Sequence, residues 1–139
     1  MSALKNTNGD IYVPIAIPFM AAASSNAGGC GWKAPFKVQI QSASLTWSAA
    51  ITGAATNNFA VSFFNRTTGA GTVQWATAIT YGNATNATKA TPITLTLSST
   101  ATDLVVAAGD FLVAELSTNG TGLLCPGGIA NVIVRAYGI

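Results

Sequence analysis

Residues that could take part in acid–base chemistry are few and scattered. The 139-residue chain has no histidine, and its only carboxylates are Asp10, Asp103, Asp110 and Glu115. Without histidine, the commonest general base and the usual zinc and copper ligand are missing. A glycosidase needs only two carboxylates, but Asp103 and Asp110 each lie at the start of an expected strand, where turn bonding accounts for them. The sequence therefore predicts a protein that is not an enzyme and uses no cofactor.

The two cysteines are the only soft metal ligands. Cys30 and Cys125 have no partner imidazole or further thiolate, so a structural zinc site within one chain is not expected. The carboxylates do not cluster as a calcium loop requires. A disulfide between Cys30 and Cys125 would close a long loop and stabilise the fold. Two free thiols in a reducing cytosol are the alternative, and the sequence leaves both open.

Several large apolar residues lie outside the regular strand patterns. Trp47 and Trp75 are on the apolar side of their expected strands, so core packing is favoured for them over a sugar-binding platform. Trp32 instead lies in a glycine-rich stretch, where it is the best single candidate for an interface anchor. Large apolar groups on irregular backbone need something to pack against. The predicted partner-binding residues are Tyr12, Phe19, Met20, Trp32 and Lys33.

The composition points to a surface that other subunits cover. Charged residues make up only 7% of the chain, against a typical share of about 25%. A free soluble protein usually keeps a well-charged surface, whereas the buried parts of interfaces are depleted in charge. The net charge of +2 is scattered, which disfavours nucleic acid as a partner. No apolar run approaches the roughly 20 residues of a membrane-spanning helix. Residues 11–23 loosely match a signal peptide, but the residues before them make a poor n-region, so secretion is not expected.

Alternation of apolar and polar residues predicts strands throughout. The parity of this alternation changes near Gln41 and Ser42, which predicts a β-bulge or corner there. Gly109-Asp110 predicts a turn that closes a hairpin between residues 104–108 and 111–116. The expected strands are residues 11–17, 36–47, 59–64, 73–81 on a single parity, 93–97, 104–108, 111–116 and 129–137.

About eight strands with no helical period indicate an all-β fold. An antiparallel, jelly-roll-like β-sandwich fits this count better than a seven-stranded immunoglobulin sandwich, since both cysteines lie in glycine-rich loops. We expect residues 1–33 to form an N-terminal arm and edge segment and residues 34–139 to form the sandwich domain. The alternative for residues 11–17 is an ordinary first edge strand, where Pro14 would be tolerated.

Two groups of turn-and-strand motifs carry a resemblance to a known family. They are residues 45–54 (LTWSAAITGA) with Asn57-Asn58-Phe59, and residues 107–112 (AAGDFL) with Gly120-Thr121-Gly122 and Pro126-Gly127-Gly128. Over about residues 36–137 the chain resembles small virion structural proteins of tailed bacteriophages, in particular jelly-roll-like capsid decoration or cement proteins.

The resemblance implies a bacteriophage virion protein that reinforces the capsid. Such a protein binds the outside of the major capsid protein lattice, often as a trimer, without nucleic acid or membrane as a partner. It would lie on the capsid surface after assembly in the host cytoplasm. The resemblance supplies no catalytic residues. A tail-fibre or receptor-binding jelly-roll module and a secreted carbohydrate-binding domain are the alternatives.

Overall fold

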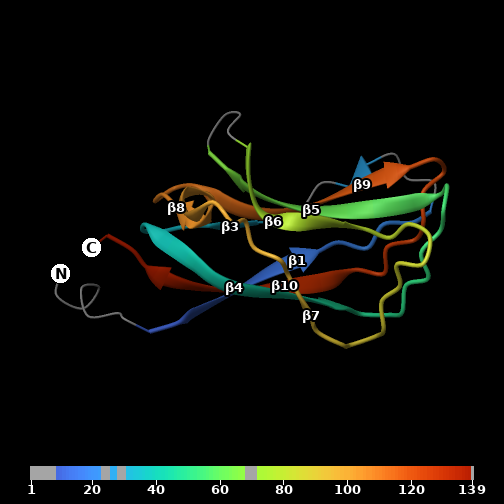
Figure 1. Cartoon of the computed structure of the whole chain (residues 1–139), viewed down its shortest axis with the longest axis horizontal. Helices are drawn as coiled ribbons and strands as arrows, with labels where there is room; N and C mark the ends of the chain where they lie inside the picture. The colour runs from blue at the N-terminus through green and yellow to red at the C-terminus, as the bar shows by residue number, and fades with distance from the viewer. Residues whose placement is uncertain (1–8, 23–25, 28–30, 68–71, 139) are drawn as a thin grey trace.

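Two antiparallel β-sheets pack face to face in the computed structural model, which describes residues 9–22, 26–27, 31–67 and 72–138 (Figure 1). Sheet A contains, in spatial order, β1 (Ile11–Ile17), β10 (Gly128–Ala136), β4 (Val38–Trp47) and β7 (Ile93–Thr94), with β8 (Val105–Val106) also paired with β4. Sheet B contains β2 (Asn26–Ala27) and β3 (Gly31–Lys33), both paired with β9 (Phe111–Asn119), then β5 (Asn58–Arg66) and β6 (Thr72–Thr80).

The strand pairs are nested along the chain. β5 pairs with β6, β4 with β7 and β8, β9 with β2 and β3, and β1 with β10. The chain is therefore one long hairpin whose two arms run side by side and roll up into two sheets, which is the jelly-roll topology. β2 and β3 together occupy one strand position of the jelly roll, beside β9. β7 and β8 together occupy another, beside β4. The predicted all-β, jelly-roll-like sandwich is confirmed.

The helical content is one short 3₁₀ turn, η1 (Ala101–Leu104), in the part of the chain that the structure describes. Within the same ranges, no helix has the length and apolar character of a membrane span.

The predicted bulge in β4 is present and keeps its apolar residues on one side. Ser42 pairs with Ile133 and Ile40 with Val134, so Gln41 is the extra residue. An unpaired residue shifts the alternation by one position and restores the inward direction for the residues after it. The buried residues are Val38 and Ile40 before the bulge, and Ala43, Leu45 and Trp47 after it.

The hairpin expected around Gly109-Asp110 is wrong. Gly109 does have a positive φ of 90°, and the Asp110 amide donates to the Ala107 carbonyl at 3.1 Å, so the turn exists. However, β8 pairs with β4 in sheet A, whereas β9 lies in sheet B. The turn therefore carries the chain from one sheet to the other. Turn chemistry sets a change of direction and leaves open which strands the two arms join.

The single parity expected for residues 73–81 is also wrong. The pairing of β6 with β5 shifts register twice, so Trp75 and Ala76 are both buried although they are adjacent in sequence. Val73 is 37% exposed and Thr77 is exposed as well. The expected strand 93–97 divides between the sheets, because Thr94 pairs with β4 while Leu97 bridges Ala76 of β6.

Residues 11–17 form the edge strand that the sequence analysis kept as the alternative. β1 lies at one edge of sheet A and pairs with β10 along its whole length. Pro14 in its middle has no N–H to offer, so it interrupts the row of edge groups to which a further strand would bind. Whether residues 1–33 act as an arm toward a partner stays a prediction.

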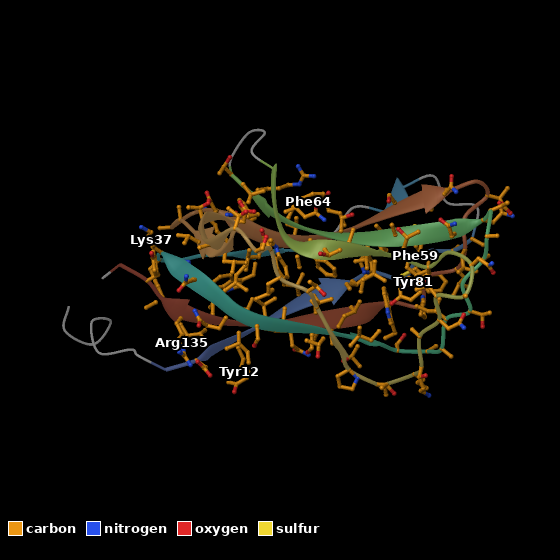
Figure 2. All side chains as sticks on the ribbon, viewed as in Figure 1. Tyr12, Lys37, Phe59, Phe64, Tyr81 and Arg135 are labelled. Carbon is orange, nitrogen blue, oxygen red and sulfur yellow. The ribbon has the colours of Figure 1, made fainter. Side chains whose placement is uncertain are left out.

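An aromatic cluster joins the two sheets. Trp47 of β4, Phe59 of β5 and Tyr81 after β6 are buried, and their ring centroids lie 5.1–5.8 Å apart. Figure 2 shows Phe59 and Tyr81 between the sheets, whereas Tyr12 points outward from sheet A. The Trp47 indole N–H donates to the Tyr81 hydroxyl at 2.6 Å. Burial raises the pKa of Tyr81 from its ordinary value, although the bond from Trp47 acts in the opposite direction.

We expect Tyr81→Phe to destabilise the fold by about 1–3 kcal/mol, because it leaves the buried Trp47 N–H without an acceptor. Urea-induced unfolding measures this free energy. Tyr12→Phe removes the same hydroxyl from a side chain that is 72% exposed and should change stability by less than about 0.5 kcal/mol. Equal stability of the two variants would contradict this role of the hydrogen bond.

Candidate functional site

The four carboxylates lie apart, each in its own setting. Asp10 pairs with Arg135 at 2.6 Å, and Glu115 receives two hydrogen bonds of 2.6 Å from Arg66. Asp103 accepts a hydrogen bond from the Ser98 hydroxyl, and Asp110 lies in the turn before β9. The described residues contain no group of three or more possible metal ligands.

The five predicted partner-binding residues lie in different parts of the molecule. Tyr12 is exposed on the outer face of sheet A, and Phe19, 62% exposed, lies in the loop after β1. Met20 is buried in the core, and Trp32 is half-buried and packs against the hydrophobic core. Lys33 is exposed, with its ammonium 5.7 Å from the ring centroid of Phe111. The structure therefore does not gather them into one patch, and Met20 and Trp32 face inward.

Four loops meet at one end of the sandwich, at the right in Figure 1. We call this surface the loop end and define it as residues 18–22, 48–57, 81–92 and 120–127. Lys89 is the one charged residue in these segments. Lys37 and Arg135 lie toward the opposite end (Figure 2), and Asp10 pairs with Arg135 there. The loop end is therefore a nearly neutral surface.

Backbone hydrogen bonds join these loops to one another. Met20 and Cys125 exchange two bonds of 2.8 and 2.9 Å, although they lie more than a hundred positions apart. Ile51 and Ala87 exchange two bonds of 2.9 Å. Paired backbone groups hold the loops in one arrangement, so we expect the loop end to be preorganised.

Asparagine side chains add further links between the loops. The Asn86 side-chain oxygen accepts a bond from the Gly53 amide, and the Asn57 side-chain oxygen accepts one from the Thr121 amide, each at 3.0 Å. Such short polar side chains readily satisfy backbone groups in turns. Asparagine side chains in these segments therefore help to hold neighbouring loops together.

Phe19 and Leu124 form an exposed apolar pair on the loop end. Met20 and Cys125 are directly opposite each other and both buried. Side chains alternate along extended backbone, so the neighbouring Phe19 and Leu124 point outward, where they are diagonal neighbours across the bridge. Their side chains are 62% and 47% exposed. Leu124 was missed by the sequence analysis, although it meets the same criterion as Phe19, a large apolar residue on glycine- and proline-rich backbone.

Cys125 lies beneath this pair as a free, buried thiol. Burial raises its pKa, with a smaller opposite effect from the backbone at Gly127. A buried thiol with a raised pKa is unreactive, so Cys125 serves packing. Cys30 lies outside the described residues.

Two glycines in the loop end offer a matched test of its rigidity. A Cβ on Gly53 would clash with the backbone oxygens of Gly82 and Thr85, whereas a Cβ on Gly82 would meet nothing within 4 Å. We expect Gly53→Ala to force the loops apart and to cost about 1–3 kcal/mol of unfolding free energy. Gly82→Ala should be neutral or slightly stabilising. Urea unfolding and amide hydrogen exchange at Ala87 would measure both, and equal behaviour of the variants would contradict a tightly joined loop end.

Comparison with known proteins gives no family assignment. No protein-family model matches the chain, and no curated protein matches it. Among solved structures, a chain of the infectious bursal disease virus, Gx strain, is similar with a TM-score of 0.45 and 9% identity, over 95% of this chain and 33% of the viral chain. The chain thus spans about a third of the length of that viral chain.

Proposed function

We propose that this chain is a non-enzymatic structural protein of a virus particle, which binds other protein subunits through its loop end. The observation that carries the proposal is the exposed pair Phe19 and Leu124 on a nearly neutral, hydrogen-bonded surface. The buried centre of a protein interface is typically apolar and aromatic with few charges. The loop end shares the low charge, and Phe19 and Leu124 supply its exposed large apolar groups.

Preorganisation favours binding at this surface. A partner that packs on Phe19 and Leu124 has little backbone to order, because the bonds between Met20 and Cys125 and between Ile51 and Ala87 already hold the loops. Binding then loses less free energy to ordering than it would on a mobile loop. An aromatic side chain at the centre of an interface is a typical binding hot spot.

The partner we propose is the major capsid protein lattice of a tailed bacteriophage, bound from outside as by a decoration or cement protein. The resemblance over residues 36–137 and the low share of charged residues support this partner. Arg66 and Arg135 are both engaged in ion pairs, which does not favour a nucleic-acid partner. Tyr12 and Lys33 are proposed as secondary contacts, on the outer faces of the two sheets.

Binding to empty capsid shells of tailed phages tests the proposal. The purified chain is mixed with shells, and the bound fraction is measured by sedimentation. The double variant Phe19→Ser, Leu124→Ser should bind at least about thirtyfold more weakly, since losing a hot spot costs about 2 kcal/mol or more. Tyr137→Ser is the control, because Tyr137 is 40% exposed near the opposite end and its ring lies beside Lys37.

The proposal fails if the native chain binds no shells. The role of the loop end fails if the double variant binds as well as the control. Thermal unfolding of all three proteins should agree closely, because the substituted side chains are exposed.

The oligomeric state that we propose is a trimer. The expected result is a mass of three chains in sedimentation equilibrium at micromolar concentration, because the low share of charged residues favours contact between subunits and the resemblance to decoration proteins favours three of them. A monomer under these conditions would contradict the trimer.

A further inference from the structure

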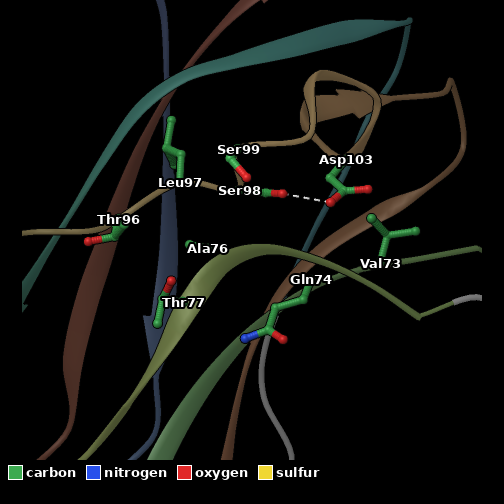
Figure 3. Close-up of a pocket in the computed structure, with 9 residues that line it drawn as sticks. All are labelled: Val73, Gln74, Ala76, Thr77, Thr96, Leu97, Ser98, Ser99 and Asp103. Atoms are coloured by element: carbon green, nitrogen blue, oxygen red, sulfur yellow. Dashed lines mark hydrogen bonds between the residues drawn. The ribbon is translucent and has the colours of Figure 1, made fainter.

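A second surface, separate from the loop end, is a groove beside β6 that is lined by both polar and apolar residues. It has a volume of about 710 Å³, within the range of ligand-binding clefts. β6 forms one wall, and the segment from Thr96 to Asp103 forms the other (Figure 3). None of the residues that line it belongs to the proposed subunit contact.

The floor of the groove is fixed by pairing between these two walls. Ala76 and Leu97 form an isolated β-bridge. The Thr77 amide donates to the Thr96 carbonyl at 2.8 Å, and the Ser98 amide donates to the Trp75 carbonyl at 2.9 Å. The polar side chains on the two walls are therefore held at a constant separation before any ligand binds.

One oriented carboxylate lies at the end of the groove. Asp103 lies in η1, and its Oδ2 accepts a bond of 2.6 Å from the Ser98 hydroxyl (Figure 3). The Ser98 hydroxyl oxygen also accepts a bond from the Thr100 amide at 3.2 Å, so it is directed from both sides. These bonds fix the carboxylate and leave its Oδ1 as an acceptor for a ligand.

Uncommitted neutral polar groups line the rest of the groove, with Thr77 and Thr96 on the side away from Asp103 (Figure 3). The side chains of Gln74, Thr77, Thr96 and Ser99 are exposed, and none of them makes a side-chain hydrogen bond to another described residue. Amide and hydroxyl groups both donate and accept. Together with Asp103, they match a ligand that carries many hydroxyls, each of which also donates and accepts.

The remaining lining of the groove narrows the ligand class. Val73, which is 37% exposed, and the half-buried Leu97 offer apolar surface for the C–H groups of a sugar ring. Among the described residues, no lysine or arginine lines the groove, so an anionic ligand would meet only the negative Asp103. A lone carboxylate also falls short of the oxygen ligands that calcium requires.

We propose that this groove binds a neutral carbohydrate chain, with Asp103 accepting hydrogen bonds from a pair of sugar hydroxyls and Gln74, Thr77 and Thr96 contacting their neighbours. This binding does not depend on the proposed capsid role. A chain could bind shells through the loop end and glycans through the groove, or do only one of the two.

The test is a titration of the isotope-labelled chain with four neutral trisaccharides, namely maltotriose, cellotriose, mannotriose and triacetylchitotriose, followed by amide NMR shifts. At least one should move the amides of residues 74–77 and 96–103 and leave the loop end unchanged. Asp103→Asn should weaken this binding about tenfold, because it replaces a charge-assisted hydrogen bond with a neutral one. Its side chain keeps an oxygen that can accept the bond from Ser98.

The control is Asp110→Asn, which removes a carboxylate outside the groove and should bind like the native chain. The proposal is overturned if none of the four sugars moves these amides at millimolar concentration, if the shifts fall elsewhere, or if Asp103→Asn binds as well as the control. It is also overturned if a lysine-rich peptide moves the groove amides and the sugars do not, because Asp103 would then bind a cationic protein segment.

Discussion

The nested pairing of strands is the constraint on which the rest of the structure depends. The pair of β5 and β6 is innermost, and each further pair encloses the one before it along the chain. The outermost pair places β1 against β10. Jelly-roll closure therefore places four loops from distant parts of the chain at one end. The Met20–Cys125 bridge, and with it the exposed pair Phe19 and Leu124, exists only because the first and last strands are neighbours.

Among the described residues, four charged side chains form ion pairs with one another. Arg66 with Glu115 and Arg135 with Asp10 form ion pairs on partly exposed surface, where such pairs stabilise the fold by at most about 1 kcal/mol. Both pairs lie outside the segments of the loop end, in which Lys89 is the one charged residue. The proposed subunit contact through the loop end therefore does not require the burial of either ion pair.

Irregular pairing produces the second surface. The two register shifts in β6 turn Thr77 outward, and the passage of residues 93–97 from sheet A toward sheet B lays Thr96 and Ser98 beside it. A regular strand on one parity would have turned Thr77 toward the core and removed it from the groove. The features that departed most from the expected pattern are thus the ones that bring the polar groups together.

Local alternation determined much of this protein from sequence alone. It predicted most of the strands, the bulge at Gln41 and the burial of Trp47 and Trp75, because a period of two depends only on neighbouring residues. The low share of charged residues came from composition alone. The irregular backbone around Phe19 separately predicted that this residue needs a partner, and its side chain is 62% exposed. Only the tertiary structure separated Phe19 from the buried Met20, added Leu124, and assigned β8 and β9 to different sheets. The physical reason is that sheet membership rests on contacts between residues far apart in the chain, which no local pattern records.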